Sequence, residues 1–235
     1  LMGGWHEGNW LSADDIASHV SSGISWYCYR FDEASGRING RAPVYQPELG
    51  GFYDIEFWES DSAESVQEGE IAIGNFEENA LPRKPKRQTG GLQTYEAEVR
   101  RLLDQKGLKG GKVAISEVTR CDLDGDGAEE VIIVAQTADA KVPAFRKGTY
   151  SIVLFRHLIK GKVETVVLKE HYYRKNISGE ANSPENYEVP FVIDANADGI
   201  MEIILRGWYY EGAWYEIYEY RDRTLKKVLE AGVGA

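Results

Sequence analysis

The sequence predicts a mainly β protein, a β-rich α+β fold with one substantial helix. Three observations support this prediction. Short runs of β-branched and aromatic residues alternate with Gly, Asn, Asp and Ser turns along most of the chain. Aromatic residues are plentiful, with 14 Tyr and 6 Trp. The one good helical pattern lies at residues 92–107, where apolar residues recur with the period of an α-helix.

Residues 1–78 are expected to form an N-terminal β-containing region. After a Gly- and Trp-rich start, Ser12 is followed three residues later by Asp15, which is the spacing of a capping box. A short helix is therefore expected to begin there and to end near Gly23. Turn-forming residues at 32–36 separate the first of three strand-forming runs from the others, and these runs lie at 24–31, 52–58 and 70–74.

Residues 79–91 are predicted to be a linker between this region and a second one at 92–235. Pro82 and Pro85 would interrupt a helix or a central strand. The basic cluster at 83–87 stands out in an acidic chain. It could bind an anionic surface, but a solvated connector is the favoured interpretation.

The C-terminal region contains an internal repeat. After the helix, two units follow the same order of strand, acidic loop, strand, strand, turn and strand. The expected strands lie at 113–120, 131–135, 150–156 and 163–168, then at 187–193, 203–206, 214–220 and 225–229. Two such blade-like β-meanders cannot close a propeller, which needs at least about four blades. We therefore expect two packed sheets, with the N-terminal strands or the helix covering an open edge.

Both acidic loops fit the pattern D-x-[DN]-x-D-G-x-x-E, which indicates calcium. Calcium prefers six to eight hard oxygen ligands, and a tight loop supplies them at alternate positions. An oxygen-only set argues against zinc or copper, and magnesium tolerates such flexible geometry poorly. The candidate ligands are the side chains of Asp122, Asp124, Asp126 and Glu130 with the carbonyl of Ala128, and the side chains of Asp194, Asn196, Asp198 and Glu202 with the carbonyl of Ile200.

Three roles remain open for these loops. A metal in such a loop can hold two strands together without doing chemistry, it can recognise a ligand directly, or the loop can be an acidic turn without an ion. The first role is favoured, because four carboxylates this close repel one another unless a cation is present. The second loop is expected to bind more weakly, since Asn196 replaces an acid.

The residues after each motif separate these loops from EF-hands. The twelfth position holds Ile133 or Leu205 instead of a bidentate Glu, and the flanks are strand-like. Over residues 112–230 the chain resembles the FG-GAP or VCBS-type calcium-binding repeats. It also resembles a type of uncharacterised secreted or lipoprotein-borne bacterial domain, in its helix, its strand at 150–154 and the stretch 209–212. The resemblance implies two structural Ca²⁺ sites in an extracellular or cell-surface protein, whose signal segment is not among these residues.

Composition and motifs narrow the possible functions. The net charge of −11 argues against a nucleic-acid surface, and no apolar run approaches the length of a transmembrane helix. None of the common catalytic motifs occurs, so an enzyme is disfavoured. The leading hypothesis is an extracytoplasmic, calcium-stabilised, non-catalytic binding or scaffold module. The alternative is a secreted hydrolase, or an accessory domain of one that binds carbohydrate or peptide.

Two further features are left open by the sequence. An aromatic stretch could stack on a sugar or a peptide, or could be a hairpin with half its rings in the core, and its candidate residues are Trp208, Tyr209, Tyr210 and Trp214. Cys28 and Cys121 could form a disulfide, although two buried thiols are the favoured interpretation. The sequence does not identify a protein, peptide or carbohydrate partner, or an oligomeric state.

Overall fold

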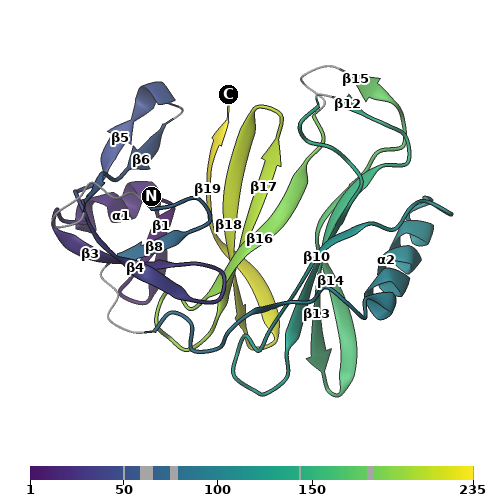
Figure 1. Cartoon of the computed structure of the whole chain (residues 1–235), viewed down its shortest axis with the longest axis horizontal. Helices are drawn as coiled ribbons and strands as arrows, with labels where there is room; N and C mark the ends of the chain where they lie inside the picture. Colours follow the sequence, from purple (N-terminus) through teal and green to yellow (C-terminus); the bar gives the residue numbers. More distant parts are fainter. Residues whose placement is uncertain (50, 59–65, 75–78, 143, 179–182, 235) are drawn as a thin grey trace.

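Antiparallel sheets form most of the structure, as the sequence predicts (Figure 1). The computed structural model describes residues 1–49, 51–58, 66–74, 79–142, 144–178 and 183–234. The chain is 51% strand and 10% helical, and the sheets do not close into a barrel. The prediction of a mainly β fold that is not a closed propeller is therefore confirmed.

The two predicted meanders form two sheets. The first has the order β14-β13-β11-β10-β9, and its strands are β9 (Lys86–Arg87), β10 (Ile115–Cys121), β11 (Glu130–Gln136), β13 (Tyr150–Ile159) and β14 (Lys162–Tyr172). The second has the order β16-β17-β18-β19, and its strands are β16 (Asn186–Ile193), β17 (Glu202–Tyr209), β18 (Gly212–Arg221) and β19 (Thr224–Gly234). A small pair, β12 (Ala144–Phe145) with β15 (Ile177–Ser178), lies beside the first sheet.

The N-terminal region has its own sheet, with the order β7-β4-β3-β8. Its strands are β3 (Ile24–Tyr29), β4 (Ala34–Gly40), β7 (Phe57–Trp58) and β8 (Ile71–Gly74). Strand β4 begins within the residues expected to be a turn, and pairing with β3 outweighs its weak strand propensity. The other elements are β1 (Gly3–His6), β2 (Asn9–Ser12), α1 (Ala13–Ile16), η1 (Ala17–His19), β5 (Val44–Gln46), η2 (Pro47–Leu49) and β6 (Phe52–Asp54).

Helix caps follow the sequence closely. The Ser12 side chain accepts a hydrogen bond from the Asp15 backbone N–H at 3.3 Å, as the capping-box spacing predicts. Helix α2 (Gln93–Gln105) is the one substantial helix, and it ends in a Schellman motif. There Gly107 has a φ of 83°, and the Leu108 N–H donates to the Leu103 carbonyl at 2.8 Å.

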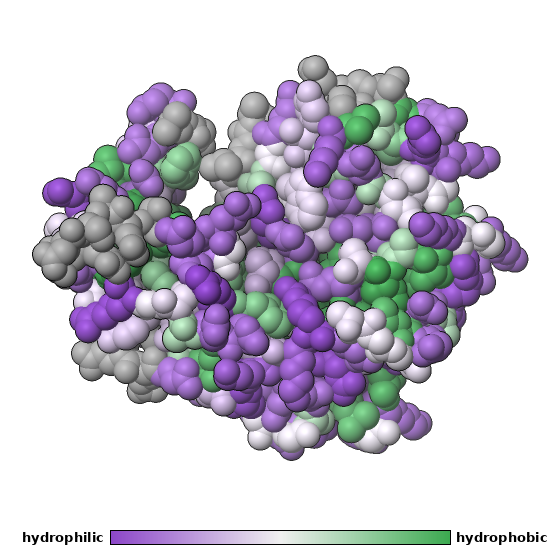
Figure 2. Space-filling view, in the orientation of Figure 1, coloured by the Kyte–Doolittle hydropathy of each residue, from purple (hydrophilic) through white to green (hydrophobic). Residues whose placement is uncertain are grey.

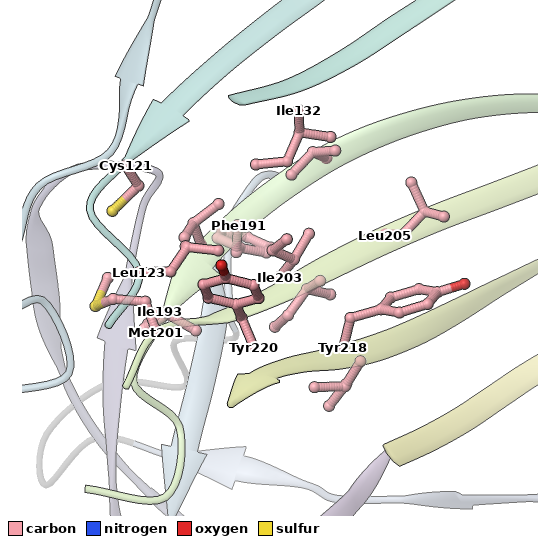
Figure 3. Close-up of a cluster of buried hydrophobic side chains, with 14 of the residues drawn as sticks. Cys121, Leu123, Ile132, Phe191, Ile193, Met201, Ile203, Leu205, Tyr218 and Tyr220 are labelled. Atoms are coloured by element: carbon pink, nitrogen blue, oxygen red, sulfur yellow. The ribbon is translucent and has the colours of Figure 1, made fainter. Parts of the chain in front are cut away.

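The central strands β11 and β13 of the first sheet are buried on both faces. One face, including Ile133 and Leu154, packs on the buried α2 residues Val99 and Leu103. Its other face, including Ile132, packs on the second sheet (Figure 3). Burying each such side chain contributes about 1.5–3 kcal/mol. The helix thus covers a face of the first sheet and not an open edge, which was one of the two expectations from the sequence.

The N-terminal region covers the outer face of the second sheet. Trp10, Ile71 and Ile73 pack against the main hydrophobic core, and they line a cavity together with Phe191 and Ile204 of the second sheet. The molecule is therefore layered, from the N-terminal region through the second and first sheets to α2 (Figure 1). This differs from the expectation that the N-terminal strands cover an open edge. Hydrophilic residues cover most of the surface in Figure 2.

The predicted linker packs closely against the rest of the chain. Ala80 and Leu81 are buried in the main core, and β9 pairs with β10 at the edge of the first sheet. An edge strand exposes unpaired backbone groups, and β9 satisfies part of this edge. The division into 1–78, 79–91 and 92–235 remains a prediction. In the basic cluster Lys84, Lys86 and Arg87 are exposed and Arg83 is half-buried, and the solvated connector remains a prediction.

Candidate metal sites in two acidic loops

The two acidic loops occupy equivalent places in the two sheets. The first connects β10 to β11 and the second connects β16 to β17. The loops also contact each other directly, since the Met201 N–H donates to the Leu123 carbonyl at 2.8 Å. Leu123 and Met201 are fully buried side chains that anchor the loops in the core (Figure 3). The repeat therefore brings both predicted sites together at one end of the paired sheets.

The leading Asp organises each loop through backbone hydrogen bonds. One oxygen of Asp122 accepts from the Gly127 N–H at 3.1 Å, and Asp194 accepts from the Gly199 N–H at 2.9 Å. The two glycines have φ values of 89° and 83°, a left-handed conformation that glycine adopts without strain. Ala197 also lies in this region, with a φ of 61°. Both sequences thus fold into the same tight turn.

Three carboxylates converge in the first loop. One oxygen each of Asp122, Asp124 and Glu130 lie within 4.8 Å of one another. A calcium ion holds its ligands at about 2.3–2.6 Å, so two ligands of one ion lie no more than about 5 Å apart. The spacing of these three oxygens fits this limit. In contrast, one Asp126 oxygen accepts from the Ala128 N–H at 2.8 Å, and the proposed Ala128 carbonyl ligand remains a prediction.

Glu130 is the buried member of this trio. Its side chain accepts from the Leu123 N–H at 3.0 Å, and only 3% of the residue is exposed. Burial raises the pKa of Glu130 to about 7, and the charges of Asp124 and Asp126 act in the same direction. A bound cation would offset both effects, because it attracts the charged form.

The second loop buries its acids more deeply. Glu202 is fully buried, and one of its oxygens accepts from the Ala195 N–H at 2.8 Å. Its other oxygen has no hydrogen-bond partner among the described residues. Burial raises the pKa of Glu202 to about 9, and burial also raises the pKa of Asp194. A buried carboxylate oxygen without a donor costs free energy, so this position favours a metal or a proton.

The second loop also differs in its charge partners. Asp198 pairs with the Arg221 guanidinium, and Asn196 donates to Asp198 at 3.2 Å. The Ile200 N–H donates to Asp198 at 2.8 Å, whereas the proposed Ile200 carbonyl ligand remains a prediction. Within the described residues, a group of three converging acids occurs in the first loop alone. The expectation of a second calcium site therefore rests on Asp194, Asn196 and Glu202.

Arg83 joins the two loops and was not predicted as a site residue. Its guanidinium donates to the carbonyls of Asp122 and Gly199, and to the Leu123 carbonyl at 2.9 Å. Arg87 makes similar contacts further along, with Glu117 and with the Val189 carbonyl at 2.6 Å. The basic cluster in a chain with two acidic loops was the sequence feature that could have predicted such a contact. Which arginine bridges them depends on the path of 79–87 through the fold.

The predicted aromatic residues lie at the other end of β17, in the hairpin that leads to β18. Trp214 packs edge-on against Tyr187 with ring centroids 6.2 Å apart, and it covers Gly207 so closely that a Cβ there would clash. Tyr209 packs beside Trp214, and Arg206 lies over Trp208. Tyr210 is exposed. The structure does not bring these aromatics to the acidic loops.

The two cysteines lie in different cores. Cys28 packs in the N-terminal region, whereas Cys121 packs beside the first acidic loop, and no disulfide joins them. Burial raises the pKa of Cys121 to about 12, which keeps this thiol neutral. The favoured interpretation of two buried thiols therefore fits the structure.

No described helix is both long and apolar enough to cross a membrane. The chain was also compared with models of protein families, with curated proteins and with solved structures. None of these three comparisons found a match. The resemblance to FG-GAP or VCBS-type repeats therefore remains a prediction, and the function has to be argued from the geometry.

Proposed function

We propose that this protein is a calcium-stabilised, non-catalytic binding or scaffold module that acts outside the cytoplasm. The observation that carries the proposal is the convergence of Asp122, Asp124 and Glu130 within 4.8 Å. The loop holds this trio through backbone hydrogen bonds, so little ordering remains to be done when an ion binds. The second loop supplies a weaker site of the same kind.

The role of calcium in this proposal is structural. Each loop connects two neighbouring strands of a sheet, and its Glu is the first residue of the strand that follows the loop. An ion held by both ends of the loop therefore fixes the strand pairing. If these loops are sites of the extracellular type, their dissociation constants would be about 10⁻⁴–10⁻³ M. Such sites would fill where calcium is millimolar, as the proposed extracytoplasmic location requires.

Thermal unfolding in calcium and in chelator tests the proposal. At a calcium concentration about one hundred times the dissociation constant, binding stabilises the folded state by about 2.7 kcal/mol. For a chain of this size the melting temperature would rise by about 5–10 °C. An equal melting temperature in calcium and in chelator would refute the structural role.

Substitutions locate the effect. Asp122→Ala is expected to remove more of the calcium-dependent rise in melting temperature than Asp194→Ala, because the first loop contains the three converging carboxylates. Asp32→Ala, at an exposed turn of the N-terminal region, is the matched control and should keep the full rise. The reverse order of the two loop variants would show that acid count does not decide which loop dominates.

The alternative of a secreted hydrolase, or of an accessory domain that binds carbohydrate or peptide, receives less support. A glycoside hydrolase needs two carboxylates on either side of the scissile bond. A cavity of about 880 Å³ has two acids in its wall, Asp54 and Glu70, but Arg30 engages Glu70 at 3.2 Å. The aromatic hairpin at 207–214 is largely packed on its own backbone. The ion pair of Glu70 disfavours a hydrolase, and the packing of the hairpin disfavours a carbohydrate or peptide site there.

A further inference from the structure

A cavity of about 880 Å³ lies between the N-terminal region and the outer face of the second sheet. The second sheet contributes Phe191, Ile204 and Tyr215 to its wall. The second acidic loop contributes Asn196 and Ala197. Small-molecule sites have volumes of about 300–1,000 Å³, so this cavity is large enough for one.

Aromatic rings make up much of the cavity wall and support one another. Trp5 and Trp10 meet edge to face, with ring centroids 5.3 Å apart, and Trp26 meets Phe57 in the same way at 5.5 Å. Trp10 also donates its indole N–H to Glu219 at 3.2 Å. These contacts fix the ring orientations, so the apolar wall exists before a ligand enters.

The wall contains two carboxylates, Asp54 and Glu70, and no Lys or Arg among the lining residues that the structure describes. The Leu1 ammonium and the imidazoles of His6 and His19 also lie on lining residues. Arg30 neutralises Glu70. Asp54 accepts a hydrogen bond from the Ile55 N–H at 2.9 Å. Within the described residues it forms no ion pair with another side chain, but it interacts electrostatically with the Leu1 ammonium. A cation would therefore be attracted by the aromatic faces and by Asp54.

We propose that this cavity binds a small molecule with an apolar body and a cationic amine or quaternary ammonium group. The apolar body would pack on the tryptophans, and the cationic group would lie near Asp54. This inference deepens the proposed function, because it gives the binding module a site and a class of ligand. It places the site away from the aromatic hairpin at 207–214.

A series of three probes tests the charge preference with the unaltered protein. Decyltrimethylammonium, decanol and decanoate share a ten-carbon chain and carry a positive, a neutral and a negative head group. Binding is followed by calorimetry and by tryptophan fluorescence, below the concentrations at which the probes form micelles. The cationic probe is expected to bind about tenfold more tightly than the anionic one. Equal affinities, or tighter binding of decanoate, would overturn the proposed ligand class.

Two variants locate the binding. Ile73→Trp fills the cavity from β8 and should weaken binding of the cationic probe by about tenfold or more. Val163→Trp, on the exposed part of β14, is its control and should leave binding unchanged. Asp54→Asn keeps the acceptor for the Ile55 N–H but removes the charge. This substitution should weaken the binding of the cationic probe by about fivefold and leave the binding of decanol unchanged.

Circular dichroism identifies any variant that fails to fold. If Ile73→Trp does not fold, Asp54→Asn and the probe series still decide the outcome. A folded Ile73→Trp protein that binds the probe as tightly as the unaltered protein would overturn the location.

Each titration is repeated in calcium and in chelator. Probe binding without a calcium-dependent melting temperature would refute the structural calcium role alone, whereas a calcium effect without probe binding would refute only the cavity.

Discussion

The two repeat units share a strand order and a loop geometry, yet they surround their acids differently. In the first loop Asp122, Asp124 and Glu130 converge. In the second, Asp194 and Glu202 are almost wholly buried. The hydrogen bonds from loop N–H groups to the leading Asp and to the final Glu recur in both. The motif therefore specifies the backbone of the loop, while neighbouring residues set its charge.

The largest effect expected is on the contact between the two loops. Arg83→Met removes three hydrogen bonds to the carbonyls of Asp122, Leu123 and Gly199, and it leaves two loops of negative charge without their shared cation. We expect the free energy of unfolding to fall by about 3 kcal/mol. Chemical denaturation measures this change, and Lys84→Met, at the exposed neighbour, is the control. Equal stability of the two variants would show that Arg83 merely lies beside the loops.

The two repeat units also differ in the polarity of their third strands, β13 and β18. The buried part of strand β13 includes Ser151 and His157 but no acid, whereas β18 carries the buried Glu216. Lys169 of β14 reaches across to Glu216 at 2.6 Å, so this ion pair joins the two sheets. Lys227 and Tyr218 also contact Glu216, at 3.4 and 2.7 Å. The polar link replaces apolar packing at one place in the interface.

This ion pair predicts a pH dependence. Burial raises the pKa of Glu216, but the hydrogen bonds from Lys169 and Tyr218 outweigh burial and hold the pKa below its ordinary value. A lowered pKa contributes stability that is present above about pH 4.5 and is lost as the pH falls through the folded-state pKa. Glu216→Gln should cost about 2 kcal/mol at pH 7, and this difference should shrink towards pH 3.

Denaturation at several pH values checks this prediction. The control is Glu230→Gln, which removes the other acid that Lys227 contacts but lies at a more exposed position. It should cost well under 1 kcal/mol at every pH, since exposed ion pairs contribute little. A constant difference between Glu216→Gln and the unaltered protein from pH 7 to pH 3 would contradict the proposed ionisation.

Local patterns predicted most of the fold. The meanders and α2 follow from period-2 and helical patterns, and the turn in each acidic loop follows from its Asp and Gly spacing. The sequence did not predict strand β4, because Ala-Ser-Gly-Arg-Ile-Asn-Gly has little strand propensity and forms a strand through its pairing with β3. The sequence also did not predict the contacts of Arg83 or the ion pair of Arg221 with Asp198, since these contacts join residues far apart in the sequence. Local spacing carries no information on such contacts.

The smallest effect expected is on the calcium affinity of each loop. Asn196→Asp gives the second loop the acid that Asp124 supplies in the first, and Asp124→Asn makes the reverse change. If charge count sets affinity, the first variant should raise the affinity of the second loop about tenfold, and the other should lower that of the first loop by a similar factor.

Calorimetric titration of calcium into both variants measures these changes. Asp32→Asn, at an exposed turn away from the loops, should leave both affinities unchanged. If Asn196→Asp has no effect, the Arg221 guanidinium on Asp198 controls the second loop instead, because it already offsets negative charge where the ion would bind. Arg221→Gln would then raise the affinity that Asn196→Asp did not. The outcome decides whether the loops differ through their own residues or through the strand beside them.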